Sequence, residues 1–339
     1  MAEIITRTVP LGISACVFNC PVRYNGKAFD ALKLLGREKA DFSWTPVCPE
    51  CLAGLGVPRT PVHLTGTGEE VLAGTTKVLD RRGRDVTEAI LEGSRCALSA
   101  LDRAGARSFI AKEASPSCGL YKARVGKQRT AMGGSGVFGA MLLASGRFLI
   151  PDEGLANSLT WWDWRRRLLA WLWLSECEVT SSRDLYDAWH TVKFVIQETD
   201  RPFADEMGRR LAALPKGASA DALDPLRTEM LVALRTRSTK PRIRQALYKT
   251  WAQARKSGKL SGVDTHGVSV GSPEERASVD EVARDLIALE RISFESDLLF
   301  GTSPVIRRDR RRVVARERER VAEEPDSADR PKPMPSQES

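Results

Sequence analysis

The chain has 339 residues, a length that suggests two domains and a tail and that can bury hydrophobic cores without disulfides or a structural metal. Its composition, 42% hydrophobic and 28% charged, excludes wholesale disorder, a collagen-like repeat and a disulfide scaffold. The net charge of +8 favours a polyanion over a basic molecule as partner.

The cysteines and the apolar segments bear on the compartment. Seven cysteines cannot all pair within one chain, and the first residues lack the basic-then-apolar pattern of a secretion signal. The most apolar segment, residues 161–174, is interrupted by Asp163 and three arginines, well short of the ~18 uninterrupted apolar residues that a membrane span requires. We therefore expect a cytoplasmic protein with reduced thiols and no membrane partner.

Residues 1–154 alternate short apolar runs with helical patterns, which predicts a Rossmann-like α/β domain with an open parallel sheet. The expected strands are residues 4–15, 42–47, 108–111 and 147–150. The expected helices are residues 27–39, 85–105 and 137–143. Residues 64–78 are expected to be irregular or to form short strands.

From about residue 158 the pattern changes to long helical periodicities with few glycines. This change predicts an all-α domain over residues 155–303. The expected helices are residues 159–174, 184–197, 203–214, 225–256 and 278–299. Residues 304–339 join a charge-dense run to a Pro- and Ser-rich end, so we expect a charged, largely disordered tail in which part of the run is helical.

Three cysteines follow the expected strands. Cys16 comes after the first, Cys48 after the second, and Cys118 a few residues after the third. In an open parallel sheet, ligands bind beyond the carboxyl ends of the strands, so these three thiols are expected to converge. Thiolates are the ligands of iron–sulfur clusters, and three of them leave one iron open.

A second arrangement uses Cys16, Cys20, Cys48 and Cys51 as a four-thiolate zinc site, with spacings near those of structural sites. It leaves the Ser-Pro-Ser-Cys-Gly segment at 115–119 unexplained. From spacing alone, the cluster and the zinc site stay equally open.

Two other uses of cysteine remain. Cys48 and Cys51 have the spacing of a redox dithiol, but that motif depends on a helix N-terminus, which the glycines at 54 and 56 argue against. Buried free cysteines are commonly inert, and Cys96 and Cys177, on expected helices, fit that use.

Three ordered segments carry a family resemblance. They are Ile-Ser-Ala-Cys at 13–16 with Pro-Val-Arg-Tyr-Asn-Gly at 21–26, Val-Cys-Pro-Glu at 47–50 with Gly-Leu-Gly-Val-Pro-Arg at 54–59, and Lys-Glu-Ala-Ser-Pro-Ser-Cys-Gly at 112–119. They resemble the successive motifs of the thiouracil desulfidase (TudS) family. The resemblance implies a [4Fe-4S] cluster held by Cys16, Cys48 and Cys118, with one iron not ligated by protein that takes the sulfur of a thiolated pyrimidine.

Replacing C=S by C=O needs a thiophilic Lewis acid, a water and a group that moves protons. Glu50, two residues after Cys48, is the expected general acid or base, and Ser115 is expected to hydrogen-bond the ring or the water. Both match positions that are functional in the family that the chain resembles. Arg23 and Arg59 are expected to contact a phosphate or stabilise an oxyanion.

Residues 230–263 contain nine Lys and Arg residues and no Asp or Glu. The alternatives are a solvated helix face and a nucleic-acid surface, in which cations meet phosphates and rings stack on bases; we favour the latter. The residues expected to bind nucleic acid there are Arg235, Arg237, Lys240, Arg242, Arg244, Lys249 and Trp251.

A second resemblance lies in residues 185–194 and 206–211, which are similar to the YbgA-like helical domain fused to this desulfidase domain in RudS proteins. It implies 4-thiouridine in tRNA as the substrate, and it matches Lys193, expected to contact a phosphate. The leading hypothesis is a [4Fe-4S]-dependent desulfidase acting on tRNA or a thiolated pyrimidine nucleoside, giving uridine and sulfide. The alternative is a non-catalytic, zinc-containing nucleic-acid-binding protein.

Overall fold

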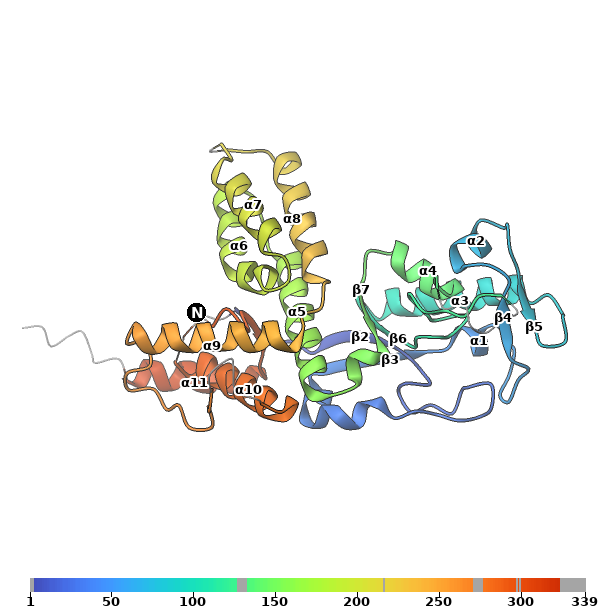
Figure 1. The fold of residues 1–339 in the computed structure, drawn as a ribbon, viewed down its shortest axis with the longest axis horizontal. Helices are drawn as coiled ribbons and strands as arrows, with labels where there is room; N and C mark the ends of the chain where they lie inside the picture. Colours follow the sequence, from blue (N-terminus) through green and yellow to red (C-terminus); the bar gives the residue numbers. More distant parts are fainter. Residues whose placement is uncertain are drawn as a thin grey trace, which may run out of the picture.

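A computed structural model describes residues 3–126, 133–215, 217–270, 277–296, 298 and 300–323. The chain begins with a parallel-sheet α/β part and continues as a set of helices (Figure 1), which confirms the predicted fold class. Within the described ranges, no helix combines the length and the apolar character needed to cross a membrane.

The central sheet has four parallel strands. Their order is β3 (Phe42–Val47), β2 (Val9–Ser14), β6 (Ser108–Ala111) and β7 (Phe148–Pro151). Parallel sheets are covered on both faces, which explains why β2, β6 and β7 are buried and apolar at most positions, whereas the edge strand β3 is buried only at its two ends. Because all four run in one direction, their carboxyl ends lie along one edge.

Alternate residues of these strands enter two cores. Ile13 and Ile150 face helix α5 (Ser158–Glu176), whereas Phe109 and Leu149 face the opposite side. The opposite side is covered by helices α3 (Thr87–Arg103) and α4 (Val137–Ala144). Gly12 also points there, where an added Cβ would lie 2.6 Å from side chains of α3 and β6, so only glycine fits.

Shorter elements complete the α/β part. They are η1 (Ala31–Asp41), α1 (Pro49–Leu52), β4 (Val62–Leu64), α2 (Gly68–Leu72), β5 (Val78–Asp80) and η2 (Asp152–Leu155). The helix expected over 27–39 is the 3-10 helix η1, interrupted at Gly36, whose φ is 49°. β4 and β5 form an antiparallel pair in the segment expected to be irregular or short-stranded.

The helical part contains α5 and six further helices among the described residues. They are α6 (Ser182–Gln197), α7 (Arg201–Ala212), α8 (Ala220–Leu234), α9 (Lys240–Lys256), α10 (Val279–Ser296) and α11 (Arg310–Glu323). The single helix expected over 225–256 is wrong, because α8 ends at Leu234 and α9 begins anew with Pro241 in its first turn.

Both ends of the chain depart from expectation. Residues 4–15 form two strands, and the first, β1 (Glu3–Ile5), pairs in parallel with β8 (Val305–Arg307). The start of the expected disordered tail is thus a strand, whereas helix α11 agrees with the expectation that part of the charge-dense run is helical. Residues 324–339 lie outside the described residues.

Helix α5 is the element around which the other parts are arranged. In Figure 1, α6–α8 form one arm, α9–α11 another, and the sheet lies on a third side of α5. One hydrophobic core continues from Ile13 in β2 through Leu168 in α5 to Val192 in α6. The domain boundary predicted near residue 154 stays a prediction.

Consecutive arginines on α5 are buried rather than exposed. Arg166 pairs with Asp163 (2.6 Å) and with Glu198 (2.7 Å), and its side chain is fully buried. The Nε of Arg167 lies 3.1 Å from Asp163. Although burial raises the pKa of Asp163, the charges of Arg166 and Arg167 hold this pKa below its ordinary value.

A second pair joins α5 to α10. Arg165 Nη2 lies 2.6 Å from Glu290 Oε2, and both side chains are buried. Trp162 Nε1 donates to the other oxygen of Glu290 at 2.9 Å. Trp161 Nε1 donates to Glu38 of η1 at 2.7 Å. Polar bonds from α5 therefore reach η1, α6 and α10.

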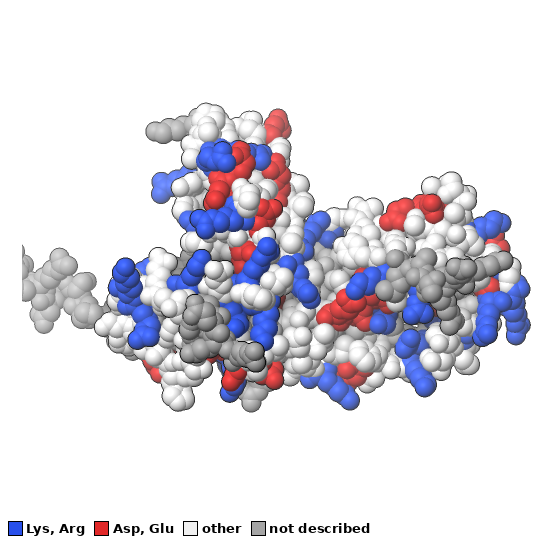
Figure 2. Space-filling model, viewed as in Figure 1, with Lys and Arg blue, Asp and Glu red and all other residues white. Residues whose placement is uncertain are grey.

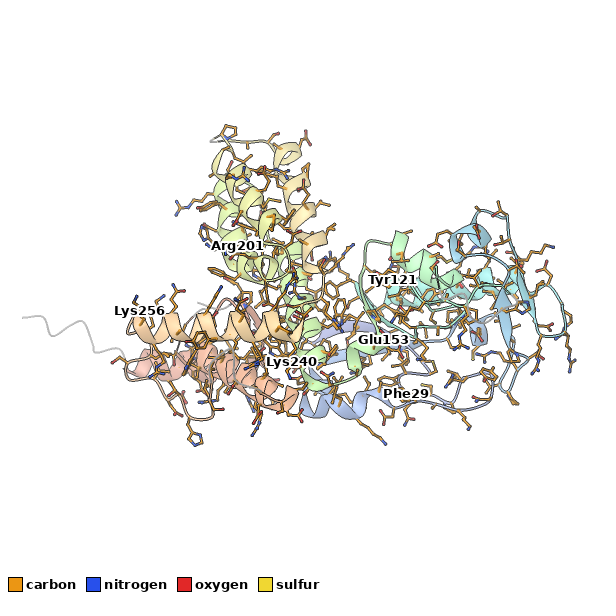
Figure 3. All side chains as sticks on the ribbon, viewed as in Figure 1. Phe29, Tyr121, Glu153, Arg201, Lys240 and Lys256 are labelled. Atoms are coloured by element: carbon orange, nitrogen blue, oxygen red, sulfur yellow. The ribbon has the colours of Figure 1, made fainter. Side chains whose placement is uncertain are left out.

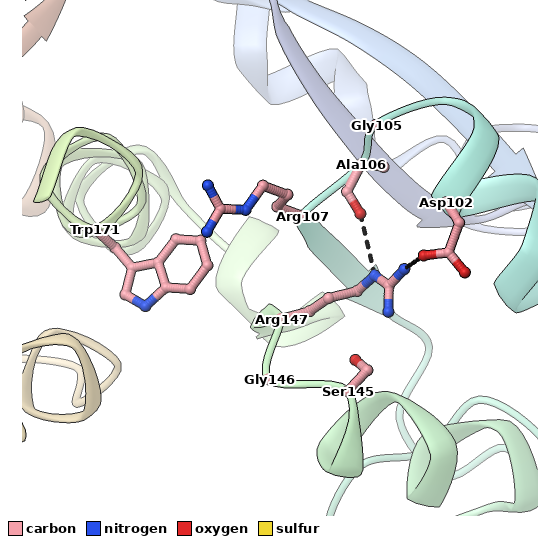
Figure 4. A pocket seen from close by; sticks show the side chains of 8 residues that line it. All are labelled: Asp102, Gly105, Ala106, Arg107, Ser145, Gly146, Arg147 and Trp171. Carbon is pink, nitrogen blue, oxygen red and sulfur yellow. Dashed lines mark hydrogen bonds and ion pairs between the residues drawn. The ribbon is translucent and has the colours of Figure 1, made fainter. Parts of the chain in front are cut away.

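A pocket of about 270 Å³ lies at the amino end of β6 and β7, beside α5 (Figure 4). The Arg107 guanidinium lies over the Trp171 ring, 5.2 Å from its centroid. Arg147 pairs with Asp102 and donates from Nε to the Ala106 carbonyl at 3.1 Å. These contacts join the sheet to α5 at the edge opposite the strand ends that precede the three cysteines.

Removing Arg166 is expected to destabilise the fold strongly, because the buried Glu198 would lose its closest cation and Asp163 would keep only Arg167. We expect Arg166→Ala to lower the free energy of unfolding by about 3–5 kcal/mol. The control is Arg183→Ala, whose pair with Asp187 is solvent-exposed and should cost below about 1 kcal/mol. Urea denaturation measures both, and equal losses would contradict the assignment.

Candidate functional site

Cys16 lies in a tight turn directly after β2. The N–H of Val17 donates to the Ser14 carbonyl at 2.8 Å, closing the turn. The N–H of Ala15 donates to the Val47 carbonyl at 2.8 Å, which ties the turn to the end of β3. The turn that holds Cys16 is therefore fixed beside the residue that precedes Cys48.

Cys48 is the N-cap of α1, a single helical turn over Pro49–Leu52. The expectation that no helix follows Cys48 is wrong. Helix α1 packs closely on α3, where a Cβ at Gly93 would lie 2.3 Å from the Pro49 carbonyl oxygen. The absence of a side chain at Gly93 thus lets α1 lie directly against α3.

Cys118 lies in the loop 112–119, which is bonded to the start of α4. Backbone N–H groups at the start of a helix lack partners within the helix, and here the loop carbonyls supply them. The N–H groups of Val137, Gly139 and Gly136 donate to the carbonyls of Pro116 (3.1 Å), Ser117 (2.9 Å) and Gly119 (2.8 Å), in that order.

Two carboxylates anchor the same loop. Glu113 is buried and accepts the backbone N–H groups of three residues that follow the loop, the shortest bond being 3.0 Å from Lys122. Asp152, just after β7, accepts the Glu113 N–H at 2.9 Å and lies 2.5 Å from Lys112 Nζ. Neither carboxylate was among the expected site residues, and no sequence signal singles out Asp152.

Cys118 lies within electrostatic reach of both Cys16 and Cys48. Burial raises the pKa of Cys118 well above its ordinary value, and the neighbouring charges of Cys16 and Cys48 raise it further. Burial also raises the pKa of Cys48, to about 12. The pKa of Cys16 is raised by burial, against the lowering effect of Lys112 and Arg23.

Glu50 lies beside the thiols in a fixed position. Its Oε2 accepts two bonds from Arg59, at 2.7 Å from Nε and 2.6 Å from Nη2. Its Oε1 accepts the Ser117 hydroxyl at 3.0 Å. Ser117 is a buried residue that the sequence analysis did not single out, although it lies within the motif at 112–119.

The structure assigns Arg59 a different task from the expected phosphate contact. Its side chain is only 5% exposed, and Nη1 donates to the carbonyls of Val22 (2.8 Å) and Gly56 (3.1 Å). Burial lowers the pKa of Arg59, but the adjacent Glu50 raises it above its ordinary value. Arg59 is therefore a positioning residue for Glu50.

Ser115 caps the turn that carries Cys118. Its Oγ accepts the backbone N–H groups of Ser117 (3.2 Å) and Cys118 (3.1 Å). The residue before it, Ala114, has a φ of 57°, a strained conformation for a non-glycine residue. Ser115 Oγ acts only as an acceptor in these two bonds, so its hydroxyl proton can be donated to a bound molecule.

All seven cysteines have free thiols. Among the described residues, no group of three or more His, Cys, Asp or Glu side chains has the geometry of a single-metal site. Cys51 instead donates to the Val22 carbonyl at 3.8 Å. Cys96 is exposed on α3, against the expected core position, and Cys177 is half-buried at the end of α5.

Several of the expected nucleic-acid contacts are used within the fold. Trp251 is only 9% exposed and packs in the core between α9 and α10, so the expectation that it stacks on a base is wrong. Arg235 lies over the Trp171 ring and donates to the Gly146 carbonyl, which links it to the α/β part. Lys193 Nζ is bonded to His190 at 2.8 Å.

The basic residues of α9 differ in their surroundings. Lys240 Nζ donates to the Ala277 carbonyl at 2.8 Å, and Arg242 Nη1 donates to the Thr199 carbonyl at 3.0 Å. Lys249 is exposed, as is Arg237 in the loop before α9, and Arg244 is half-buried. Figure 2 shows Lys and Arg side chains gathered along α9 with few acidic ones among them.

The comparisons with known proteins match the α/β part. The family model described as 2-thiouracil desulfurase matches residues 11–153. The uncharacterized protein YbbK of Bacillus subtilis (strain 168) is 38% identical over 155 residues, which cover 43% of this chain and 98% of that protein. The chain belongs to the 2-thiouracil desulfurase family.

Family membership supports a desulfurase activity, and the matched region contains all three clustered thiols as well as Glu50. The chain is also similar to the solved structure of a [4Fe-4S]-dependent thiouracil desulfidase, TudS. The two are 31% identical, with 44% of this chain and 93% of that chain covered and a TM-score of 0.37.

Two glycine substitutions test how the Cys118 loop is held. A Cβ at Gly139 in α4 would lie 1.9 Å from the Gly119 carbonyl oxygen, so we expect Gly139→Ala to cost about 1–3 kcal/mol of stability. At Gly208, inside α7, the nearest atom would be 3.9 Å away, and Gly208→Ala should stabilise by about 0.5–1 kcal/mol. Denaturant melts of both variants should therefore move in opposite directions; a matching stabilisation would disprove the close packing of α4 on the loop.

Proposed function

We propose that the chain is a [4Fe-4S]-dependent desulfidase that converts a thiolated uracil to uracil. The observation that carries the proposal is the placement of Cys16, Cys48 and Cys118 at the ends of three adjacent parallel strands, with Glu50 beside them. The reaction consumes one water and releases sulfide. A C–O bond forms, the C–S bond breaks, and no net oxidation or reduction occurs.

The donor set fits a cluster better than a single ion. Thiolates that bind different irons of a cube need not converge on one point, so three neighbouring thiols from three separate loops suit a cluster. Three protein ligands leave one iron without a protein ligand. When bound, the cluster would supply a thiophilic Lewis acid that draws off the sulfur.

The chain's own residues supply the proton transfers. Glu50 is held at both oxygens, so its carboxylate keeps one orientation toward the thiols. In the proposed reaction, Glu50 accepts the proton of the attacking water. Ser115 keeps its hydroxyl proton for the pyrimidine ring or the water. Lys112 and Arg23 lie near Cys16 and favour negative charge there, as thiolate ligands require.

We further propose that the substrate is 4-thiouridine within tRNA, in the reducing cytoplasm. A surface hollow of about 470 Å³ beside Glu50's partner Arg59 is lined also by Arg81 and Arg82, with no carboxylate among its lining residues. A nucleotide chain would meet its phosphates there and along α9. A free base would use neither surface.

Cysteine variants test the cluster. After anaerobic reconstitution, Cys16→Ala, Cys48→Ala and Cys118→Ala should each lose the broad absorption of a [4Fe-4S] cluster and the conversion of 4-thiouridine to uridine. Cys96→Ala, exposed on α3, is the control and should keep both, as should Cys20→Ala and Cys51→Ala. Loss confined to the Cys20 and Cys51 variants would overturn the proposed ligand set.

A carboxylate variant tests the proton transfer separately from the cluster. We expect Glu50→Gln to keep the cluster absorption and to lower kcat by about 10²–10⁴-fold, the range found for general acid–base groups. Glu92→Gln, on the exposed side of α3, is the matched control and should leave kcat unchanged. Wild-type turnover in Glu50→Gln would remove Glu50 from the mechanism.

A further inference from the structure

A cleft of about 560 Å³ lies between the α6–α7 turn and α9. Its volume is within the range of about 300–1,000 Å³ that is usual for small-molecule sites. Arg201, at the end of the α6–α8 arm nearest α9, is on one side of it (Figure 3). Arg242 and Lys249 on α9 are on the other side.

The charge presented to this cleft is positive. Its lining includes two carboxylates, and both have partners inside the protein. Glu198 is buried and paired with Arg166 at 2.7 Å, and Asp200 accepts the Phe203 N–H at 2.9 Å as the N-cap of α7. Arg242 uses one nitrogen for the Thr199 carbonyl and keeps its other donors.

The same cleft contains groups that suit a nucleobase. Gln197, Gln245 and Gln253 line it, and each amide offers both donors and an acceptor. Phe194 is 50% exposed, and one side of its ring packs on Gly301, where a Cβ would be 2.7 Å away. Thr302 is 2% exposed in the same lining, and its Oγ1 has no hydrogen-bond partner among the residues that the structure describes.

We infer that this cleft binds one nucleotide of an RNA. Arg242 and Lys249 receive the phosphates, and the glutamine amides meet the base edge. The half-exposed Phe194 ring, which has Lys193 Nζ 5.0 Å from its centroid, stacks on the base. An acidic peptide would match the cations but would leave the aromatic ring and the three amides unused. The inference rests on the proposed function in taking RNA as the substrate class, and it adds a second contact point away from the thiols.

The test measures the binding of unmodified tRNA to the full chain by fluorescence anisotropy, over a range of salt concentrations. Arg242→Ala with Lys249→Ala should lower affinity at least tenfold and reduce the salt slope by about 2, one unit for each phosphate contact. Arg255→Ala with Lys256→Ala removes the same charge from the same helix outside the cleft, and it should lower affinity less than threefold.

Two aromatic substitutions distinguish stacking on a base from nonspecific electrostatic attraction. Phe194→Ala should lower affinity about tenfold with no change in salt slope, because stacking on an aromatic ring contributes about 1–3 kcal/mol per base and releases no counterions. Tyr248→Ala, an exposed ring on α9 outside the cleft lining, should bind tRNA as the wild type does. Thermal melts of all variants show whether they stay folded.

Equal losses in the two double variants, together with wild-type binding by Phe194→Ala, would overturn the inference and leave general charge attraction. Competition by polyglutamate as effective as that by RNA would overturn it as well. Because unmodified tRNA contains no sulfur to remove, this result does not depend on desulfuration. Failure of the reconstituted wild type to release sulfide from 4-thiouridine, both in tRNA and as the free nucleoside, would instead contradict the proposed function and leave the binding result standing.

Discussion

The parallel alignment of β3, β2 and β6 determines where the site can lie. Adjacent parallel strands end at the same edge, so residues that follow them are brought together although they are far apart in sequence. Cys16, Cys48 and Cys118 each follow one of these strands, and the fourth strand, β7, brings Asp152 to the same edge, where it anchors the Cys118 loop. The sheet thus both gathers the thiols and fixes the loop that carries the last of them.

Helix α5 links that edge to the rest of the molecule. Its apolar residues pack on the sheet, while its arginines pair with Glu198 and Glu290 in two different helices. Buried ion pairs are costly to desolvate, and breaking one leaves an uncompensated charge. Glu198 also lines the cleft between the α6–α7 turn and α9. Because its negative charge is neutralised by Arg166 of α5, the cations on α9 give the cleft its positive charge.

Much of the catalytic side could be predicted from the sequence, because its signals are local. A strand followed by a cysteine predicts a thiol at a strand end, and the short segments around the three thiols carry the family resemblance. Glu50 was singled out as a candidate by its place two residues after Cys48. Its partners Arg59 and Ser117 could not be assigned, because the bonds depend on how three loops fold over one another.

The helical part was less predictable because its decisive contacts are distant in sequence. The arginines at 165–167 break an apolar segment in the sequence. Besides the nearby Asp163, their partners Glu198 and Glu290 lie more than 30 residues away, so the sequence alone does not explain why these arginines are buried. Trp251 is one aromatic residue in a basic stretch, yet helical periodicity places it in the core. The pairing of β8 with β1 joins the two ends of the described chain and has no local signal.

The central claim is tested most directly by measuring iron and sulfide in protein purified without oxygen, and then following the reaction with 4-thiouridine in bulk tRNA. The account predicts about four irons and four sulfides per chain, and one sulfide released for each 4-thiouridine converted to uridine. Stoichiometric zinc without iron, or an iron-loaded protein that leaves 4-thiouridine intact both in tRNA and as the free nucleoside, would contradict it.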